Sequence, residues 1–92
     1  MNKRNSFKQI LKVVAAEAFL TENEIFIEAF GYDRNGSIES NKKYADMLRR
    51  CLANKQIAKI DNRIVKCRED IGKARFVYVL KEAGIIALQS SK

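Results

Sequence analysis

The pattern that most constrains this chain lies in residues 40–54, where apolar residues recur at the spacing of one helix face. That face comprises Tyr44, Met47, Leu48, Cys51 and Leu52. The other side of the same helix carries charges, namely Lys42, Lys43, Asp46, Arg49 and Arg50. Ser40 or Asn41 would cap the start, because a short side-chain oxygen accepts from the free N–H groups of a first turn. We therefore predict an amphipathic helix over 41–54.

Two further helices are predicted before it, over 5–20 and 22–30. Apolar residues recur at helical spacing through the first of these ranges, which Asn5 or Ser6 would begin. Thr21 and Glu24 have the spacing of a capping box, in which each side chain satisfies a backbone N–H of the other residue. Gly31 would end the second helix, because Gly tolerates the left-handed conformation common at helix ends.

After residue 54 the pattern changes to short β-leaning runs. Residues 57–60 and 63–67 form two such runs around a turn or bulge at Asp61 and Asn62. Residues 68–74 are polar and contain Gly72, so we predict a hairpin tip there, followed by a strand over 75–80. The whole hairpin would span 57–80, and a short last helix would span 81–89. The sequence thus predicts one α+β domain over 1–92.

Charge is distributed unevenly along the 92 residues, whose formal net charge is +7. Residues 1–46 contain seven basic and seven acidic side chains, whereas residues 47–92 contain eleven basic and four acidic ones. The excess positive charge therefore lies in the second half. A chain with one basic side would orient itself in the field of a polyanion, although a solvated basic surface without a partner remains the alternative.

The predicted order of elements resembles the winged helix-turn-helix family. Leu48, Leu52 and Ile57 resemble that family's leucine pair in the recognition helix, followed by the aliphatic residue that opens the first strand of the wing. Residues 78–88 resemble its common ending, in which Tyr-x-Leu closes the second wing strand before a small helix. One departure concerns the family's short strand between the first two helices, for which the sequence leaves almost no room.

The resemblance implies a winged helix: a three-helix bundle with a C-terminal β-hairpin wing and a short final helix. It also implies sequence-specific or semi-specific binding of double-stranded DNA by a small transcriptional regulator. The third helix would enter the major groove, and the wing would lie on the backbone or reach a minor groove. Carried onto this sequence, the contacts would come from Asn41, Lys42, Lys43, Arg49 and Arg50 in the helix, and from Lys66, Arg68, Lys73 and Arg75 in the wing.

Several alternatives remain open at this point. Asn41 can be only a helix cap, and Asp46 can orient Arg50 at helical spacing. A homodimer is possible through the first and last helices. The main alternative function is a winged-helix protein-interaction module, or adaptor, that uses the acidic second helix.

Other classes of function are not expected. The chain contains no His, and its two cysteines, Cys51 and Cys67, lack metal-ligand spacing, so no zinc site or other metal site is predicted. No paired carboxylates suggest an enzyme, and no cofactor is implied. Charged residues interrupt the apolar N-terminal run, so neither a signal peptide nor a membrane span is expected, and we expect a cytoplasmic protein.

Overall fold

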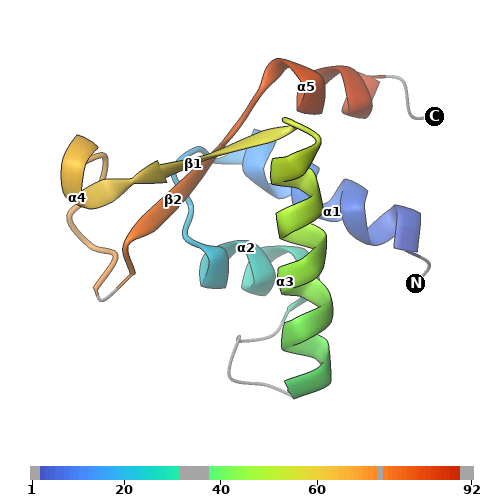
Figure 1. The fold of residues 1–92 in the computed structure, drawn as a ribbon, viewed down its shortest axis with the longest axis horizontal. Helices are drawn as coiled ribbons and strands as arrows, with labels where there is room; N and C mark the ends of the chain where they lie inside the picture. Colours follow the sequence, from blue (N-terminus) through green and yellow to red (C-terminus); the bar gives the residue numbers. More distant parts are fainter. Residues whose placement is uncertain (1–2, 32–37, 73, 90–92) are drawn as a thin grey trace.

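A computed structural model describes residues 3–31, 38–72 and 74–89, with the side chains of residues 3–6 and 38–41 left out (Figure 1). Helices and a two-stranded antiparallel sheet combine in this part of the chain, so the predicted α+β class is confirmed. The elements in chain order are α1 (Lys3–Ala16), α2 (Glu22–Phe30), α3 (Ile38–Ala53), β1 (Ile57–Asp61), α4 (Asn62–Val65), β2 (Phe76–Leu80) and α5 (Glu82–Gln89).

The hydrophobic core lies where α1, α2, α3 and the start of the hairpin meet. Its buried side chains are Ile10, Leu11, Val14, Leu20, Ile25, Phe26, Met47, Leu48, Cys51, Ile57 and Tyr78. Tyr44 and Leu52 of α3 pack against this cluster, so the apolar face predicted for the third helix is confirmed. The Tyr44 ring also stacks on Phe30 of α2, with 3.9 Å between the ring centroids.

The second helix begins and ends as predicted. Thr21 and Glu24 form the capping box, and Gly31 closes the helix in the left-handed conformation with φ 73°. The third helix begins three residues earlier than predicted, at Ile38, so neither Ser40 nor Asn41 is its N-cap.

The first helix is shorter at its C-terminal end than the predicted range 5–20, because it stops at Ala16. Residues near its predicted end bond to the sheet instead. Phe19, at φ 64°, donates its N–H to the Tyr78 carbonyl at 2.9 Å, and Tyr78 donates to the Leu20 carbonyl at 2.9 Å. Leu20 thus forms an isolated antiparallel bridge with Tyr78 of β2. It lies between α1 and α2, where the sequence was expected to leave almost no room for a strand.

The hairpin predicted over 57–80 is present, but its middle differs from the prediction. β1 and β2 pair antiparallel from Ile57 opposite Leu80 to Asp61 opposite Phe76. The range 63–67 was predicted as β-leaning, but residues 63–65 belong to the helical turn α4 and Lys66 is its C-cap. Asp61 caps this turn by accepting from the Arg63 N–H at 2.9 Å, and a capping carboxylate favours helix over strand at this point.

The last helix is confirmed at Glu82–Gln89, and Gly84 explains how it packs. A Cβ at this position would lie 2.3 Å from the Gln56 carbonyl oxygen and 2.7 Å from Leu80 Cδ1. The Gln56 carbonyl is fixed because it also accepts from the Lys81 N–H at 2.9 Å. Gly84 therefore permits α5 to approach the start of the hairpin closely.

We predict that Gly84→Ala destabilises the fold by about 1–3 kcal/mol, the usual range for overpacking. At an exposed helix position the same change would stabilise the protein by up to about 1 kcal/mol. The sign of the change in unfolding free energy therefore distinguishes a close approach at Gly84 from an open helix surface. Chemical unfolding in urea measures the effect, and Gln89→Ala at an exposed position of the same helix is the control. A Gly84→Ala variant as stable as the wild type would contradict the close approach.

Candidate nucleic-acid interface

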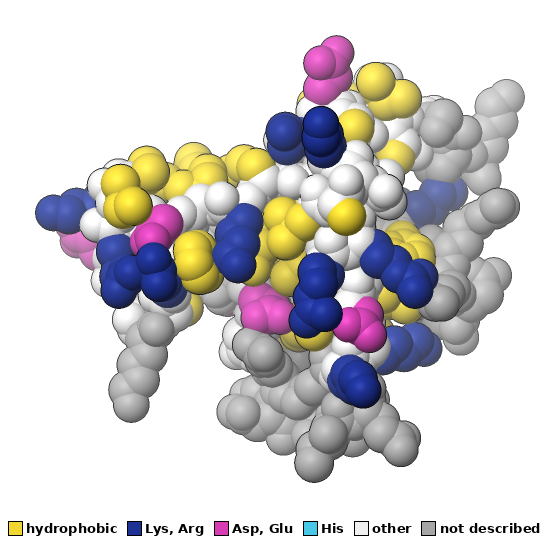
Figure 2. Space-filling model, viewed as in Figure 1, with side chains coloured by type: hydrophobic (Ala, Val, Ile, Leu, Met, Phe, Trp, Pro, Cys, Tyr) yellow, Lys and Arg dark blue, Asp and Glu magenta, His cyan; other side chains and the backbone are white. Residues whose placement is uncertain are grey.

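The outer side of α3 carries exposed basic side chains, as the sequence predicted. Lys42, Lys43, Arg49 and Arg50 are all exposed, while Met47 and Leu48 between them face the core. Lys43 and Arg50, together with Asp46 and Met47, line a shallow hollow of about 130 Å³ on the surface of this helix. Figure 2 shows basic side chains over α3 and along the hairpin on the same broad face of the molecule.

Asp46 lies within the basic side of α3 and reduces its positive charge. The sequence suggested that Asp46 could orient Arg50. In the structure its carboxylate instead accepts from Arg49 Nη1 at 3.3 Å. Both side chains are largely exposed, so this ion pair contributes little to stability and can be replaced by a phosphate contact. The side chain of Asn41 lies outside the described residues, as does Lys73 of the predicted wing.

A second group of basic side chains surrounds Phe76 on the hairpin. Lys59 Nζ lies 4.1 Å from the centroid of the Phe76 ring, and Arg75 Cζ lies 4.9 Å from it. Arg75 also donates to Asp61 from Nε at 3.0 Å and from Nη2 at 2.9 Å. Lys59 and Asp61 alternate along β1 and lie opposite Tyr78 and Phe76, so the strand register puts all of these side chains on one face.

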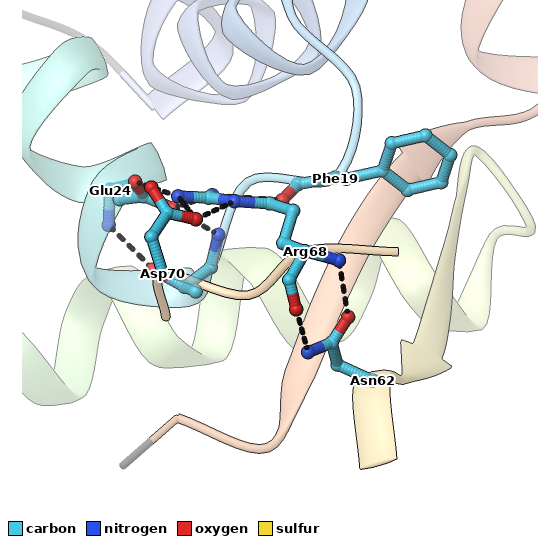
Figure 3. A network of polar contacts seen from close by, with 6 residues as sticks. Phe19, Glu24, Asn62, Arg68 and Asp70 are labelled. Atoms are coloured by element: carbon cyan, nitrogen blue, oxygen red, sulfur yellow. Dashed lines mark hydrogen bonds and ion pairs between the residues drawn. The ribbon is translucent and has the colours of Figure 1, made fainter. Parts of the chain in front are cut away.

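Arg68, predicted to contact DNA, has a different environment in the structure (Figure 3). Its guanidinium forms a two-point contact with the Glu24 carboxylate of α2, in which the Nη2–Oε2 distance is 3.0 Å. It also donates to Asp70 at 2.9 Å and to the Phe19 carbonyl at 3.1 Å. These contacts satisfy much of its charge and leave its side chain only 19% exposed. Arg68 thus connects the hairpin to the helical body.

Two further contacts hold the backbone of Arg68 in place. The side-chain amide of Asn62, at the start of α4, donates to the Arg68 carbonyl at 2.8 Å and accepts from its N–H at 3.0 Å. Asn62 is one of the few buried polar residues among those described. Because its amide meets both a donor and an acceptor, its burial does not leave unsatisfied polar groups.

Glu24 has two roles, since the same carboxylate serves the capping box of α2 and the contact with Arg68. It accepts from the Thr21 N–H at 2.9 Å. The hydrogen bond from Arg68 is the main reason that the pKa of Glu24 lies below its usual value, and the bond from Thr21 adds to this effect. The ionised form of Glu24 is therefore favoured by folding.

Lys59 and Arg63 also belong to the basic surface, although they were not among the predicted DNA contacts. Both are exposed on the hairpin, and Arg63 Nε lies 3.7 Å from an Asp61 oxygen. Strand alternation gave no signal for Lys59, because it lies two residues after the buried Ile57 and therefore on the same face of the strand, and only its charge indicated exposure. Lys66 is exposed as predicted, and it closes α4 in the left-handed conformation with φ 55°.

Other chemistry finds little support in the described part of the chain. No group of three or more metal-ligating Cys, Asp or Glu side chains occurs there. Cys51 and Cys67 are free thiols, and burial raises the pKa of Cys51 to about 11, which keeps that thiol protonated near neutral pH. Within the same residues, no helix has the length and apolar character needed to cross a bilayer.

Comparison with known proteins identifies no relative. No protein-family model, no curated protein and no solved structure matches this chain.

We predict that Glu24→Gln destabilises the domain by about 1 kcal/mol at pH 7, which is below the range of about 1.5–3 kcal/mol for a hydrogen bond to a charged group because this site is partly exposed. Gln can still form the capping box, so the change removes the charge and retains the cap. The pKa of Glu24 is lowered by folding, so its stabilising contribution is present above about pH 4.5 and is lost as pH falls below that value.

Urea unfolding of both proteins at pH 7 and pH 3 measures this difference. The gap between wild type and variant should be clear at pH 7 and should shrink at pH 3. Glu28→Gln on the exposed side of the same helix is the matched control and should leave stability unchanged. A gap of equal size at both pH values would show that the charge of Glu24 is unimportant.

Proposed function

We propose that this protein is a winged-helix domain that binds double-stranded DNA, with α3 in the major groove and the β1–β2 hairpin as the wing. The observation that carries the proposal is the basic face in Figure 2, where exposed Lys and Arg side chains of α3 and of the hairpin lie together. The bridge between Leu20 and Tyr78 adds support, since it gives β2 a second neighbour besides β1, at the position of the family's short first strand.

The two basic elements suit the two kinds of contact that DNA offers. Lys42, Lys43 and Lys59 are suited to phosphates, because cations that neutralise phosphates release condensed counterions and so supply affinity. Arg49 and Arg50 on the outer side of α3 can also bond to the guanine edge with two donors. Affinity would therefore come from both elements, and sequence preference from α3.

Arg68 is excluded from the proposed contact surface, because its guanidinium is bound to Glu24 and Asp70. Its role in the proposal is to hold the hairpin against α2, so that the wing keeps a fixed direction relative to α3. Arg75 can contribute only in part, because Asp61 neutralises it. Arg63 and Lys59 take the place of Arg68 in the proposed wing.

The adaptor alternative depends on the acidic residues of α2. One of these, Glu24, is already paired with Arg68, which weakens α2 as a free acidic docking surface. We therefore favour the binding of double-stranded DNA over the adaptor role.

We predict that the double variant Lys43→Ala, Arg50→Ala binds mixed-sequence duplex DNA more weakly than the wild type and with a smaller salt dependence. Each phosphate contact removed should lower the slope of log K against log salt concentration by about 0.9. Fluorescence anisotropy over a series of salt concentrations measures both quantities. Both residues are exposed, so the fold should be retained.

Lys12→Ala is the matched control for loss of positive charge. Lys12 is exposed on α1 and lines a separate hollow together with Glu17 and Glu28. Its loss should leave the salt slope unchanged. Equal slopes for wild type and the double variant would reject the α3 surface, and no binding by the wild type at low salt would reject DNA as the partner.

A further inference from the structure

We infer that the α4 turn inserts Ile64 and Val65 between base pairs in the minor groove and thereby bends the DNA. This inference rests on the proposed DNA binding and adds a second, apolar contact to it. Ile64 is 78% exposed and Val65 is 58% exposed, the two highest values among the large hydrophobic residues described. Neither contributes to the core, so folding alone does not account for two adjacent aliphatic side chains at this position.

The exposed pair is held in a rigid setting. Asp61 caps the turn at its start, Lys66 closes it by donating its N–H to the Asn62 carbonyl at 2.9 Å, and the Asn62 side chain is clamped to the Arg68 backbone. The Asn62 N–H also donates to the Arg75 carbonyl at 2.8 Å across the hairpin. A turn fixed at both ends can push side chains into a stack of bases with little loss of conformational entropy on binding.

Charge complementarity indicates that DNA is the partner of the exposed Ile64 and Val65. Arg63, Ile64, Val65 and Lys66 are consecutive and all exposed, so the α4 turn and its cap present an apolar pair together with two cations. The minor groove offers a partner for each, since its base steps can take apolar side chains and its two rows of phosphates attract cations. Proteins that bend DNA from this groove use one or a few aliphatic side chains as wedges. A stable protein interface needs about 800 Å² from each partner, far more than these two side chains offer.

The length of the hairpin is consistent with this placement. β1 has five residues, which span about 16 Å at the usual rise of about 3.3 Å per residue. Adjacent major and minor grooves lie about half a helical repeat apart, or roughly 17 Å of the ~34 Å repeat. With α3 in the major groove, α4 at the far end of β1 therefore reaches the neighbouring minor groove. Figure 2 shows basic and hydrophobic side chains together at that end of the hairpin.

The first test compares wild type with the double variant Ile64→Ala, Val65→Ala on a duplex of about 25 base pairs that carries a dye at each end. Resonance energy transfer measures bending, and anisotropy of the same duplex measures binding. We expect the wild type to bend the duplex by about 20–90°, the range for inserted wedges, and the double variant to bind without bending it. Because both side chains are exposed, the variant should unfold at the wild-type temperature.

A second measurement uses the absence of Trp from the chain, which makes Ile64→Trp a single fluorescent reporter. We expect DNA to quench this reporter by stacking, and to leave unchanged the control Ile86→Trp, at an exposed position of α5. Binding without bending or quenching would overturn the insertion and leave the proposed function intact. No binding would overturn both, and a blue shift with anionic phosphatidylglycerol vesicles but no response to DNA would reassign the pair to a membrane surface.

Discussion

The contact between Arg68 and Glu24 is the interaction on which the arrangement of the basic face depends. The two residues lie 44 positions apart, and their contact joins the hairpin to the first turn of α2. The same guanidinium binds the Phe19 carbonyl, next to the bridge between Leu20 and β2. Hairpin, α2 and the segment after α1 are therefore connected at one point, and the direction of the hairpin follows from it.

A fixed hairpin matters because the proposed surface is made from two separate elements. Neither α3 nor the hairpin offers all of its cations to a partner, since Asp46 pairs with Arg49 and Asp61 pairs with Arg75. The two groups act together on a duplex only if their spacing is constant. The buried amide of Asn62 and the ion pair of Arg68 keep this spacing fixed. The proposed contacts with DNA come from Lys43, Arg50 and Lys59.

The sequence predicted those features that depend on local pattern. The stripe of α3, the capping box at Thr21 and Glu24, the end of α2 at Gly31 and the strand over 75–80 follow from periodicity and from preferences of single residues. Features set by distant partners were missed. Helix α1 ends early because Phe19 and Leu20 form backbone hydrogen bonds with Tyr78. Arg68 pairs with Glu24, which is far away in the sequence. No local spacing indicates either contact. Asp61 was a local signal for the α4 turn, because Asp is a favoured helix cap. The β-leaning residues on both sides of it favoured a strand instead.

Titration of the isotopically labelled protein with a mixed-sequence duplex, followed by the NMR chemical shifts of the backbone amides, would show directly whether α3 and the hairpin contact DNA together. We expect shifts in α3 and in the hairpin around Lys59 and α4, with α1 and α5 unaffected. The amide of Arg68 should remain in its folded environment, because its contacts with Asn62 hold the hairpin in place. Shifts confined to α2, or no shifts at low salt, would reject α3 and the hairpin as a DNA-binding surface.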